Sequence, residues 1–285
     1  MFCDLNVPWP VQAQSSAPSM SKKAKKLAQK AATSEDIVDE QQNALDALSP
    51  SEKKRISEIT YELMEMGYTT VAYNYIVHTK YDPAIQKNPF SGTPPFPKLD
   101  PRTRKSYGVE SYREGIKQLT RLTVVLDNDQ AIKSGSGFVS ANALALQRYD
   151  LLSVTPTTEM AFQHACITLS ELKPFSVDII SLDLAVAPRL PFHLKRSTVG
   201  AALSNGVVFE ITYGAAIDAK SSSLSSKSTS EMSDLSDARR NLFSGAREIL
   251  RVTNGKGVIL SSQAMDAMGL RAPYDVMNLY VRRTT

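Results

Sequence analysis

Apolar residues along the chain follow two alternating patterns: short continuous runs, and longer segments in which they recur every three or four positions. Residues 69–77 (TTVAYNYIV) are β-branched and aromatic, which is typical of a strand. Before them, Ser49 and Glu52 form a capping-box pattern ahead of a segment with one apolar helical face, and Gly67 suits its C-cap. This stretch therefore predicts one helix followed by one strand.

The same alternation continues to the end of the chain. The predicted strands are residues 2–7, 69–77, 121–127, 150–154, 177–184, 207–213 and 257–262. The predicted helices are the one after Ser49, 138–148, 158–170, 193–204, a segment ending at Asn254-Gly255, and one opened by Pro273. Apolar strands separated by helices imply a parallel sheet covered by helices, and so many consecutive βα units favour closure. We predict an α/β fold, a TIM-like barrel of about seven parallel strands with an irregular or incomplete eighth unit.

Two stretches depart from this pattern. Residues 11–48 begin with a Ser/Ala/Gln/Pro tract, pass through the basic run Lys22–Lys26 and turn acidic, and residues 218–236 are rich in serine. Neither stretch can bury enough apolar surface to offset the entropy of ordering it. We therefore expect a single barrel domain over residues 1–285 with flexible insertions at 11–48 and 218–236. The basic run resembles a nuclear-targeting patch, and a solvated tail explains it equally well.

Composition excludes several classes of protein. A chain that is 42% hydrophobic and 22% charged is not disordered throughout. No apolar run approaches the roughly 18 residues of a membrane span, and MFCDLNVPWP at the start does not resemble a secretory signal. Two cysteines are too few for a disulfide framework, and three histidines cannot build a histidine-rich metal cluster. Gly135-Ser136-Gly137 is too short a match to predict a nucleotide site.

In a barrel of this kind, catalytic residues are expected among the polar residues at the carboxyl ends of the strands. Asp127 and Asp129, with Asp183 or Glu210, have the chemistry of a metal site. The alternative is that Asp127 simply ends a strand and caps the following turn. His78 has the chemistry of a general base, but no partner carboxylate is identifiable and a solvated loop histidine is favoured. We find no convincing enzyme active site in the sequence, and we predict no catalytic residue, no metal ligand and no cofactor.

Positively charged clusters are more informative than the acids. Residues 185–205 contain Arg189, Lys195 and Arg196 and no acidic residue, and residues 239–256 hold five Lys/Arg against one Glu. Clustered positive charge attracts phosphates, which suits recognition of an RNA backbone. Helices of barrels that bind no RNA can also be basic on their solvated faces. The overall net charge of +4 permits a nucleic-acid partner without requiring one.

Five segments together resemble one family. They are DLNVPWP (4–10), GYTTVAYNYIV (67–77), RLPFHLKRSTVGAALSNGVVFEITYGAAI (189–217), GKGVILSSQA (255–264) and LRAPYDVMNL (270–279). In order and spacing they are similar to the thirty-kilodalton protein subunit of nuclear ribonuclease P and ribonuclease MRP. The resemblance spans nearly the whole chain apart from the two low-complexity insertions.

The resemblance implies a ribonucleoprotein particle whose RNA carries catalysis. Ribonuclease P removes 5′ leaders from precursor tRNAs, and ribonuclease MRP processes precursor ribosomal RNA. The expected role is that of a non-catalytic subunit that braces the particle RNA, and the expected location is the nucleus and nucleolus. Its expected protein partners are a small subunit of the same particle and other particle proteins. Precursor tRNA is expected to be contacted only indirectly. No membrane partner is expected. The residues that the resemblance makes candidates for RNA contact are Arg189, Lys195, Arg196 and Arg271.

The family resemblance also implies a barrel related to the polymerase-and-histidinol-phosphatase (PHP) metal hydrolases. Those enzymes carry an H-x-H motif on the first strand, where two imidazoles point the same way and share metal ions. Asn6 and Pro8 stand at those positions here, and proline has no ligating side chain. The scaffold is therefore expected to have lost its metals. Two alternatives stay open: a metal-dependent phosphoesterase using Asp127, Asp129, Asp183 and Glu210, and a barrel that contacts only proteins.

Overall fold

The structure, a computed structural model, describes residues 2–10, 43–90, 92–103, 115–171, 175–217 and 235–281. Most of the two expected insertions, residues 11–42 and 218–234, lies outside these ranges. Residues 43–48 do lie within them and form a short 3-10 helix, η1 (Ala44–Ala47), capped by the side chain of Asn43. Ala44 and Leu48 are buried in the core, so this end of the predicted insertion packs against the barrel.

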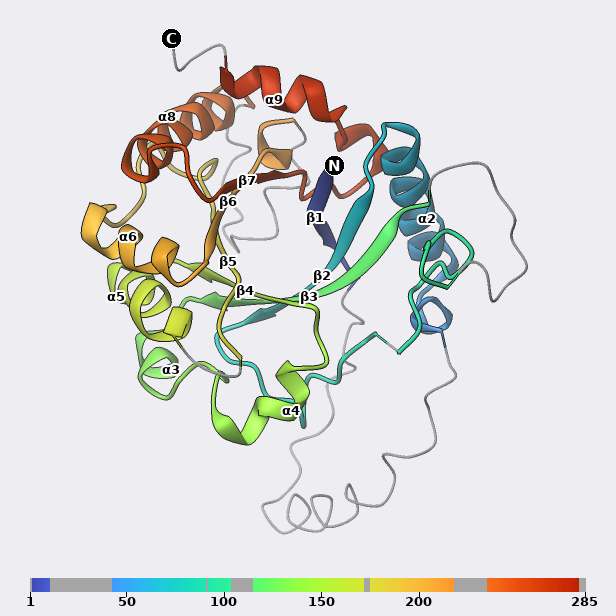
Figure 1. Ribbon diagram of the computed structural model, residues 1–285, viewed down its shortest axis with the longest axis horizontal. Helices are drawn as coiled ribbons and strands as arrows, with labels where there is room; N and C mark the ends of the chain where they lie inside the picture. The colour runs from blue at the N-terminus through green and yellow to red at the C-terminus, as the bar shows by residue number, and fades with distance from the viewer. Residues whose placement is uncertain are drawn as a thin grey trace.

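Within the described residues, seven parallel strands form one sheet in the order of the sequence. They are β1 (Cys3–Pro8), β2 (Thr70–His78), β3 (Lys117–Leu126), β4 (Leu151–Pro156), β5 (Ile179–Leu182), β6 (Val208–Thr212) and β7 (Val258–Ser261). The sheet curls into a barrel with the helices on its outside (Figure 1). The prediction of an α/β, TIM-like barrel of about seven parallel strands is confirmed.

Helices lie between consecutive strands of the described chain, except between β2 and β3. The helices are α2 (Pro50–Glu65), α3 (Asp129–Lys133), α4 (Ala143–Leu146), α5 (Glu159–His164), α6 (Arg196–Ser204), α8 (Leu235–Thr253) and α9 (Pro273–Val281). Short 3-10 helices add η3 (Ser140–Asn142), η5 (Gly214–Ala216) and η6 (Ala267–Gly269), and the π-helix η4 (Ala165–Leu169) continues α5. In α2 the expected capping box between Ser49 and Glu52 is present. No helix of the described ranges is both long and apolar enough to cross a membrane.

Side chains, rather than backbone pairing, join the two edges of the barrel in the described part of the chain. The Asp4 carboxylate on β1 accepts from the backbone N–H of Ser262, just after β7, at 3.2 and 3.3 Å. On the outside, the Arg55 guanidinium of α2 donates to the carbonyls of Pro8 and Met265, each at 3.1 Å. The barrel is therefore nearly closed, and its irregular eighth unit is a side-chain seam.

Gly137 is expected to be the least replaceable of the glycines in the Gly135-Ser136-Gly137 turn. Its φ of +94° lies in the left-handed region, and a Cβ there would collide with the backbone of Tyr81. We expect Gly137→Ala to lower the free energy of unfolding by about 1–3 kcal/mol, measured by urea denaturation. The matched control is Gly200→Ala in α6, where a Cβ meets no atom within 4 Å and Ala should add about 0.5–1 kcal/mol. Equal effects of the two substitutions would contradict this account.

Candidate functional site

A buried ion pair spans the inside of the barrel. The Arg121 guanidinium of β3 meets the Glu210 carboxylate of β6 through Nη1–Oε1 at 2.6 Å and Nη2–Oε2 at 2.7 Å. Both side chains have no exposed surface. Alternate residues of each strand face inward, which is how two positions 89 residues apart in sequence come together. The two parallel bonds form the bidentate geometry that suits a guanidinium and a carboxylate.

Arg121 has no donor left for a ligand. Its Nε donates to the Thr123 hydroxyl at 3.1 Å, Nη1 also donates to the Leu5 carbonyl at 2.7 Å, and Nη2 also donates to the Ser153 hydroxyl at 2.8 Å. With the two bonds to Glu210, these use all the N–H groups that an arginine side chain carries. The guanidinium therefore stabilises the fold and cannot serve an incoming phosphate.

Glu210 is equally occupied. Beside the two bonds from Arg121, it accepts from the Ser261 hydroxyl at 2.7 Å and from the Asn6 amide at 3.1 Å. Burial alone would raise the pKa of Glu210, but the charge of Arg121 and hydrogen bonds from Arg121, Ser261 and Ser181 hold it below its usual value. The carboxylate is thus ionised and already surrounded by donors, and a metal ion would have to displace them.

The two positions that correspond to the H-x-H motif also belong to this framework. Asn6 donates to Glu210, and its carbonyl accepts from the Asn74 amide at 2.7 Å. The side-chain amide oxygen of Asn74 in turn accepts from the Thr123 hydroxyl at 2.6 Å. Asn6 is therefore one link in a chain of buried polar groups that runs across β1, β2 and β3. Pro8 supplies only its carbonyl, to Arg55.

The acids of the alternative metal site are not brought together. Asp127 accepts from the Thr79 hydroxyl at 2.8 Å, and Asp129, the first residue of α3, accepts from the Thr158 hydroxyl at 3.1 Å. Asp183 lines a cavity at the mouth of the barrel, and Glu210 lies inside the barrel. Across the described ranges, no three His, Cys, Asp or Glu side chains are grouped so that they could hold a metal ion.

A cavity of about 270 Å³ opens at the carboxyl ends of the strands. Its floor and sides are residues of β1 to β6, and the loop after β5 forms one wall through Arg189, Leu190 and Phe192. Arg189 is exposed there, so of the four predicted RNA contacts it is the one at the barrel mouth. In TIM-like barrels this end of the strands is where ligands bind.

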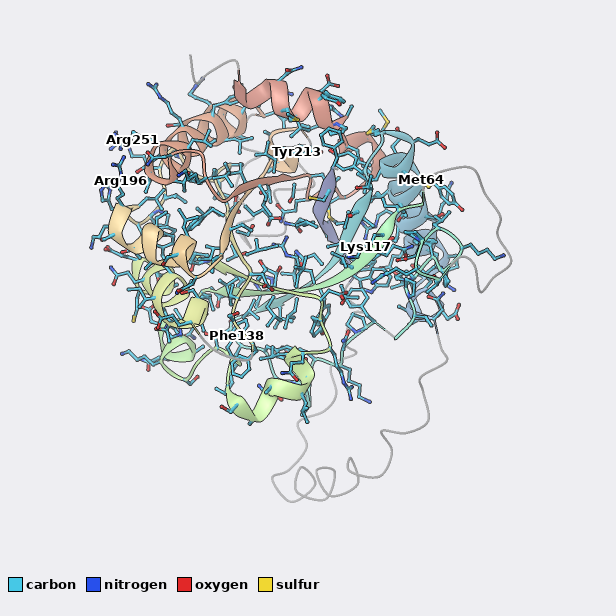
Figure 2. The ribbon with its side chains drawn as sticks, in the orientation of Figure 1. Met64, Lys117, Phe138, Arg196, Tyr213 and Arg251 are labelled. Atoms are coloured by element: carbon cyan, nitrogen blue, oxygen red, sulfur yellow. The ribbon has the colours of Figure 1, made fainter. Side chains whose placement is uncertain are left out.

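Lys195 and Arg196 lie at the start of α6, on the outside of the barrel. Lys195 is the N-cap residue and forms an exposed ion pair with Glu159 of α5 at 3.2 Å. Arg196 donates to the carbonyl of Arg251 in α8 at 3.4 Å, and Figure 2 shows the two labelled arginines at one edge of the molecule. Arg196 is therefore bonded to α8, a helix that the prediction of site residues did not include.

Arg271 lies apart from the other three, between η6 and α9. Its guanidinium donates to the carbonyls of Met268 and Leu270, and its own carbonyl accepts from the Tyr68 hydroxyl. The side chain is exposed. Arg271 precedes α9 and Arg196 opens α6, and Figure 1 shows these two helices at different places around the barrel.

One exposed stripe of arginines on α8 was not named among the predicted contacts. Arg240, Arg247 and Arg251 recur at spacings of seven and four, which places them on one side of the helix, and all three are exposed. With Lys195 and Arg196 they form what we call the basic face. The signal was present in the net positive charge of residues 239–256, and the helical spacing of its arginines would have found it.

Comparisons with known proteins agree with the resemblance found in the sequence. A family model described as RNase P subunit p30 matches residues 1–281. The chain is 31% identical over 236 residues to "Ribonuclease P protein subunit p30" of Mus musculus, covering 82% of this chain and 75% of the mouse protein. It is 29% identical over 220 residues to "Probable ribonuclease P protein subunit 3" of Schizosaccharomyces pombe, covering 76% and 72%. It is 26% identical over 282 residues to "Ribonuclease P/MRP protein subunit RPP1" of Saccharomyces cerevisiae, covering 98% and 72%.

Proposed function

Because the chain belongs to the RNase P subunit p30 family, we propose that it is an RNA-binding protein subunit of ribonuclease P and of ribonuclease MRP. The family match over residues 1–281 is the single observation that carries this proposal. The family predicted from the sequence segments is thereby confirmed. In ribonuclease P the subunit would serve the removal of 5′ leaders from precursor tRNAs, and in ribonuclease MRP the processing of precursor ribosomal RNA.

The proposed role is to brace the particle RNA, which carries the catalysis. The barrel interior supports this, because Arg121 and Glu210 saturate each other at the place where a hydrolase would keep reactive groups available. The scattered positions of Asp127, Asp129 and Asp183 offer no substitute among the described residues. No observation specifically favours the alternative of a metal-dependent phosphoesterase.

The basic face is the proposed main contact with RNA. Lys195, Arg196, Arg240, Arg247 and Arg251 present guanidinium and ammonium groups on the outer surface of α6 and α8. Such groups neutralise phosphates along a structured RNA without reading its sequence. Two of the four residues predicted from sequence, Lys195 and Arg196, thus belong to one surface.

The other two predicted contacts are proposed as separate points of attachment. Arg189 would meet RNA at the barrel mouth, and Arg271 would meet it on another side of the barrel. The remaining partners are a small protein subunit and other proteins of the particle, with precursor tRNA met only indirectly. The proposed location is the nucleus, including the nucleolus, because this is where a subunit shared by the two particles would act.

Leader removal from a precursor tRNA tests the proposal. A particle purified through a tag on this chain should cleave the 5′ leader, and digestion of its RNA with micrococcal nuclease, followed by inactivation of the nuclease, should abolish that cleavage. The purified chain alone, supplied with Mg²⁺, Mn²⁺ or Zn²⁺, should not cleave. Cleavage by the chain without RNA would contradict the proposal and favour the phosphoesterase.

A further inference from the structure

The cavity at the barrel mouth has the size and chemistry of a site for one small ring system. Its volume of about 270 Å³ is slightly below the roughly 300–1,000 Å³ of sites for drug-sized ligands. We propose that it binds a single unstacked nucleobase of the RNA partner, with Arg189 placed at the rim to meet the attached phosphate or ribose. This inference rests on the proposed function, because it names the part of the RNA that the barrel mouth would hold.

The walls of the cavity match the faces of a nucleobase. Ile76 and Val125 from the strands, with Leu190 and Phe192 from the loop after β5, give it apolar sides. A base has apolar faces and a polar edge, and proteins that recognise single-stranded RNA hold splayed-out bases between apolar or aromatic side chains. Apolar walls alone would accept any small hydrophobic molecule, so the polar groups decide the class of ligand.

Three neutral polar side chains of the lining are available for a base edge. Thr155 and Gln263 are half-buried and Thr212 is buried, and none of the three side chains makes a hydrogen bond to any other described residue. The other neutral polar groups are committed: Asn6 and Ser181 to Glu210, Thr123 to Asn74, and Thr157 to the Leu126 carbonyl. An amide and a hydroxyl each offer both a donor and an acceptor, which is the combination that the edge of a base requires.

Gln263 is also held in an unusual backbone conformation. Its φ of +51° lies in the left-handed region, where non-glycine residues are uncommon. Residues in such conformations cluster at ligand-binding sites, because the surrounding structure fixes the side chain in one direction. Gln263 lies in the lining two residues after the end of β7.

The charges of the lining argue against an anion or a metal ion inside the cavity. Among the described residues it carries one carboxylate, Asp183, and one guanidinium, Arg189, and its other side chains are neutral. A phosphate in the interior would face Asp183 and could not recruit Arg121, whose donors are all used. A divalent cation would find a single carboxylate where it needs several oxygen ligands. A neutral heterocycle with its phosphate outside, near Arg189, fits this distribution.

Nuclear magnetic resonance of the methyl-labelled full chain tests the inference without RNA. The probes are the four ribonucleoside 5′-monophosphates, and ribose 5-phosphate is the control that lacks a base. We expect saturable shifts of the Ile76 and Val125 methyl signals with at least one monophosphate and none with ribose 5-phosphate. No shift with any monophosphate, or the same shifts with ribose 5-phosphate, would overturn the inference.

Substitutions identify the side chains involved. Thr155→Val removes a hydroxyl at nearly constant volume, and Gln263→Gly removes the amide while suiting the positive φ. Each should weaken monophosphate binding about tenfold. Gln147→Ala, at an exposed position after α4, is the control and should leave binding unchanged. Unchanged binding by both cavity variants would also overturn the inference.

The outcome separates this inference from the proposed function. A particle that cleaves precursor tRNA normally, built on a chain whose cavity binds no monophosphate, would overturn the base site and leave the subunit role intact. A chain that yields no particle and no leader removal would overturn the proposed function, whatever its cavity binds.

Discussion

Replacing Glu210 with Gln is expected to lower the free energy of unfolding by about 3–5 kcal/mol. The substitution keeps the shape of the side chain but leaves the Arg121 guanidinium buried, with no exposed surface and no counter-charge. An unpaired charge in the interior of a protein costs far more than the loss of one hydrogen bond. Urea denaturation of the full chain, followed by circular dichroism, measures the difference.

The control is an ion pair of the same type on the surface. Glu159→Gln breaks the ion pair with Lys195. In that pair the Lys195 side chain is 53% exposed and the Glu159 side chain 49%. Because water screens such a pair, the expected loss is under about 1 kcal/mol. If the two substitutions destabilise the chain equally, the barrel interior is not organised around the buried pair.

The effect of Glu210→Gln on the free energy of unfolding is also expected to depend on pH. The pKa of Glu210 is lower in the folded chain than in the unfolded chain. The stabilisation that ionised Glu210 gives the fold is therefore complete above the unfolded pKa of about 4.3, and it is lost as pH falls through the folded pKa. The gap in unfolding free energy between the native chain and Glu210→Gln should therefore narrow below about pH 4.

Neutralising the basic face is expected to weaken RNA binding by roughly 50-fold at 0.15 M salt. The variant combines Lys195→Gln, Arg196→Gln and Arg251→Gln, which removes three adjoining positive charges from α6 and α8. Each lost phosphate contact should also reduce the slope of log affinity against log salt by about 0.7, or about 2 in all. Filter binding of the particle RNA over a range of salt concentrations measures both quantities.

A matched variant removes the same net charge elsewhere. Lys54, Lys87 and Lys133 are exposed lysines outside the basic face, and replacing all three with Gln tests whether overall charge explains the effect. We expect this control to retain most of the affinity and of the salt slope. An unchanged affinity in the basic-face variant, or equal losses in both, would favour a barrel that contacts only proteins.

Most of the fold could be predicted because its helices and strands depend on patterns of residues that are close together in sequence. The strand at β2 and the capping box of α2 depend on residues close together in sequence. Boundaries were less predictable where tertiary contacts decide them. β3 begins at Lys117, four residues before the predicted start. Its first residues are polar, and their hydrogen bonds go to residues distant in sequence; for example, the Asp100 carboxylate accepts from the backbone N–H of Gln118. The predicted helix over 138–148 is only η3 and α4.

The candidate site was less predictable than the fold. The sequence predicts a strand that begins at Arg121 and offers Glu210 as a possible metal ligand, but neither segment indicates that the two side chains pair across the barrel. Likewise, Lys195 and Arg196 were found from local charge, but their neighbour Arg251 is brought to them by the packing of α6 against α8. Long-range pairing of polar groups depends on the curvature of the whole sheet, which local sequence does not encode.

The RNA that accompanies this chain is the most direct test of its role as a brace for a catalytic RNA. Tagged full-length chain would be purified from nuclear extract under gentle salt, and the associated RNA sequenced. The account predicts one abundant structured RNA for each particle, together with precursor tRNA. Intact, folded chain recovered without RNA, and able to turn over a phosphoester by itself, would contradict it.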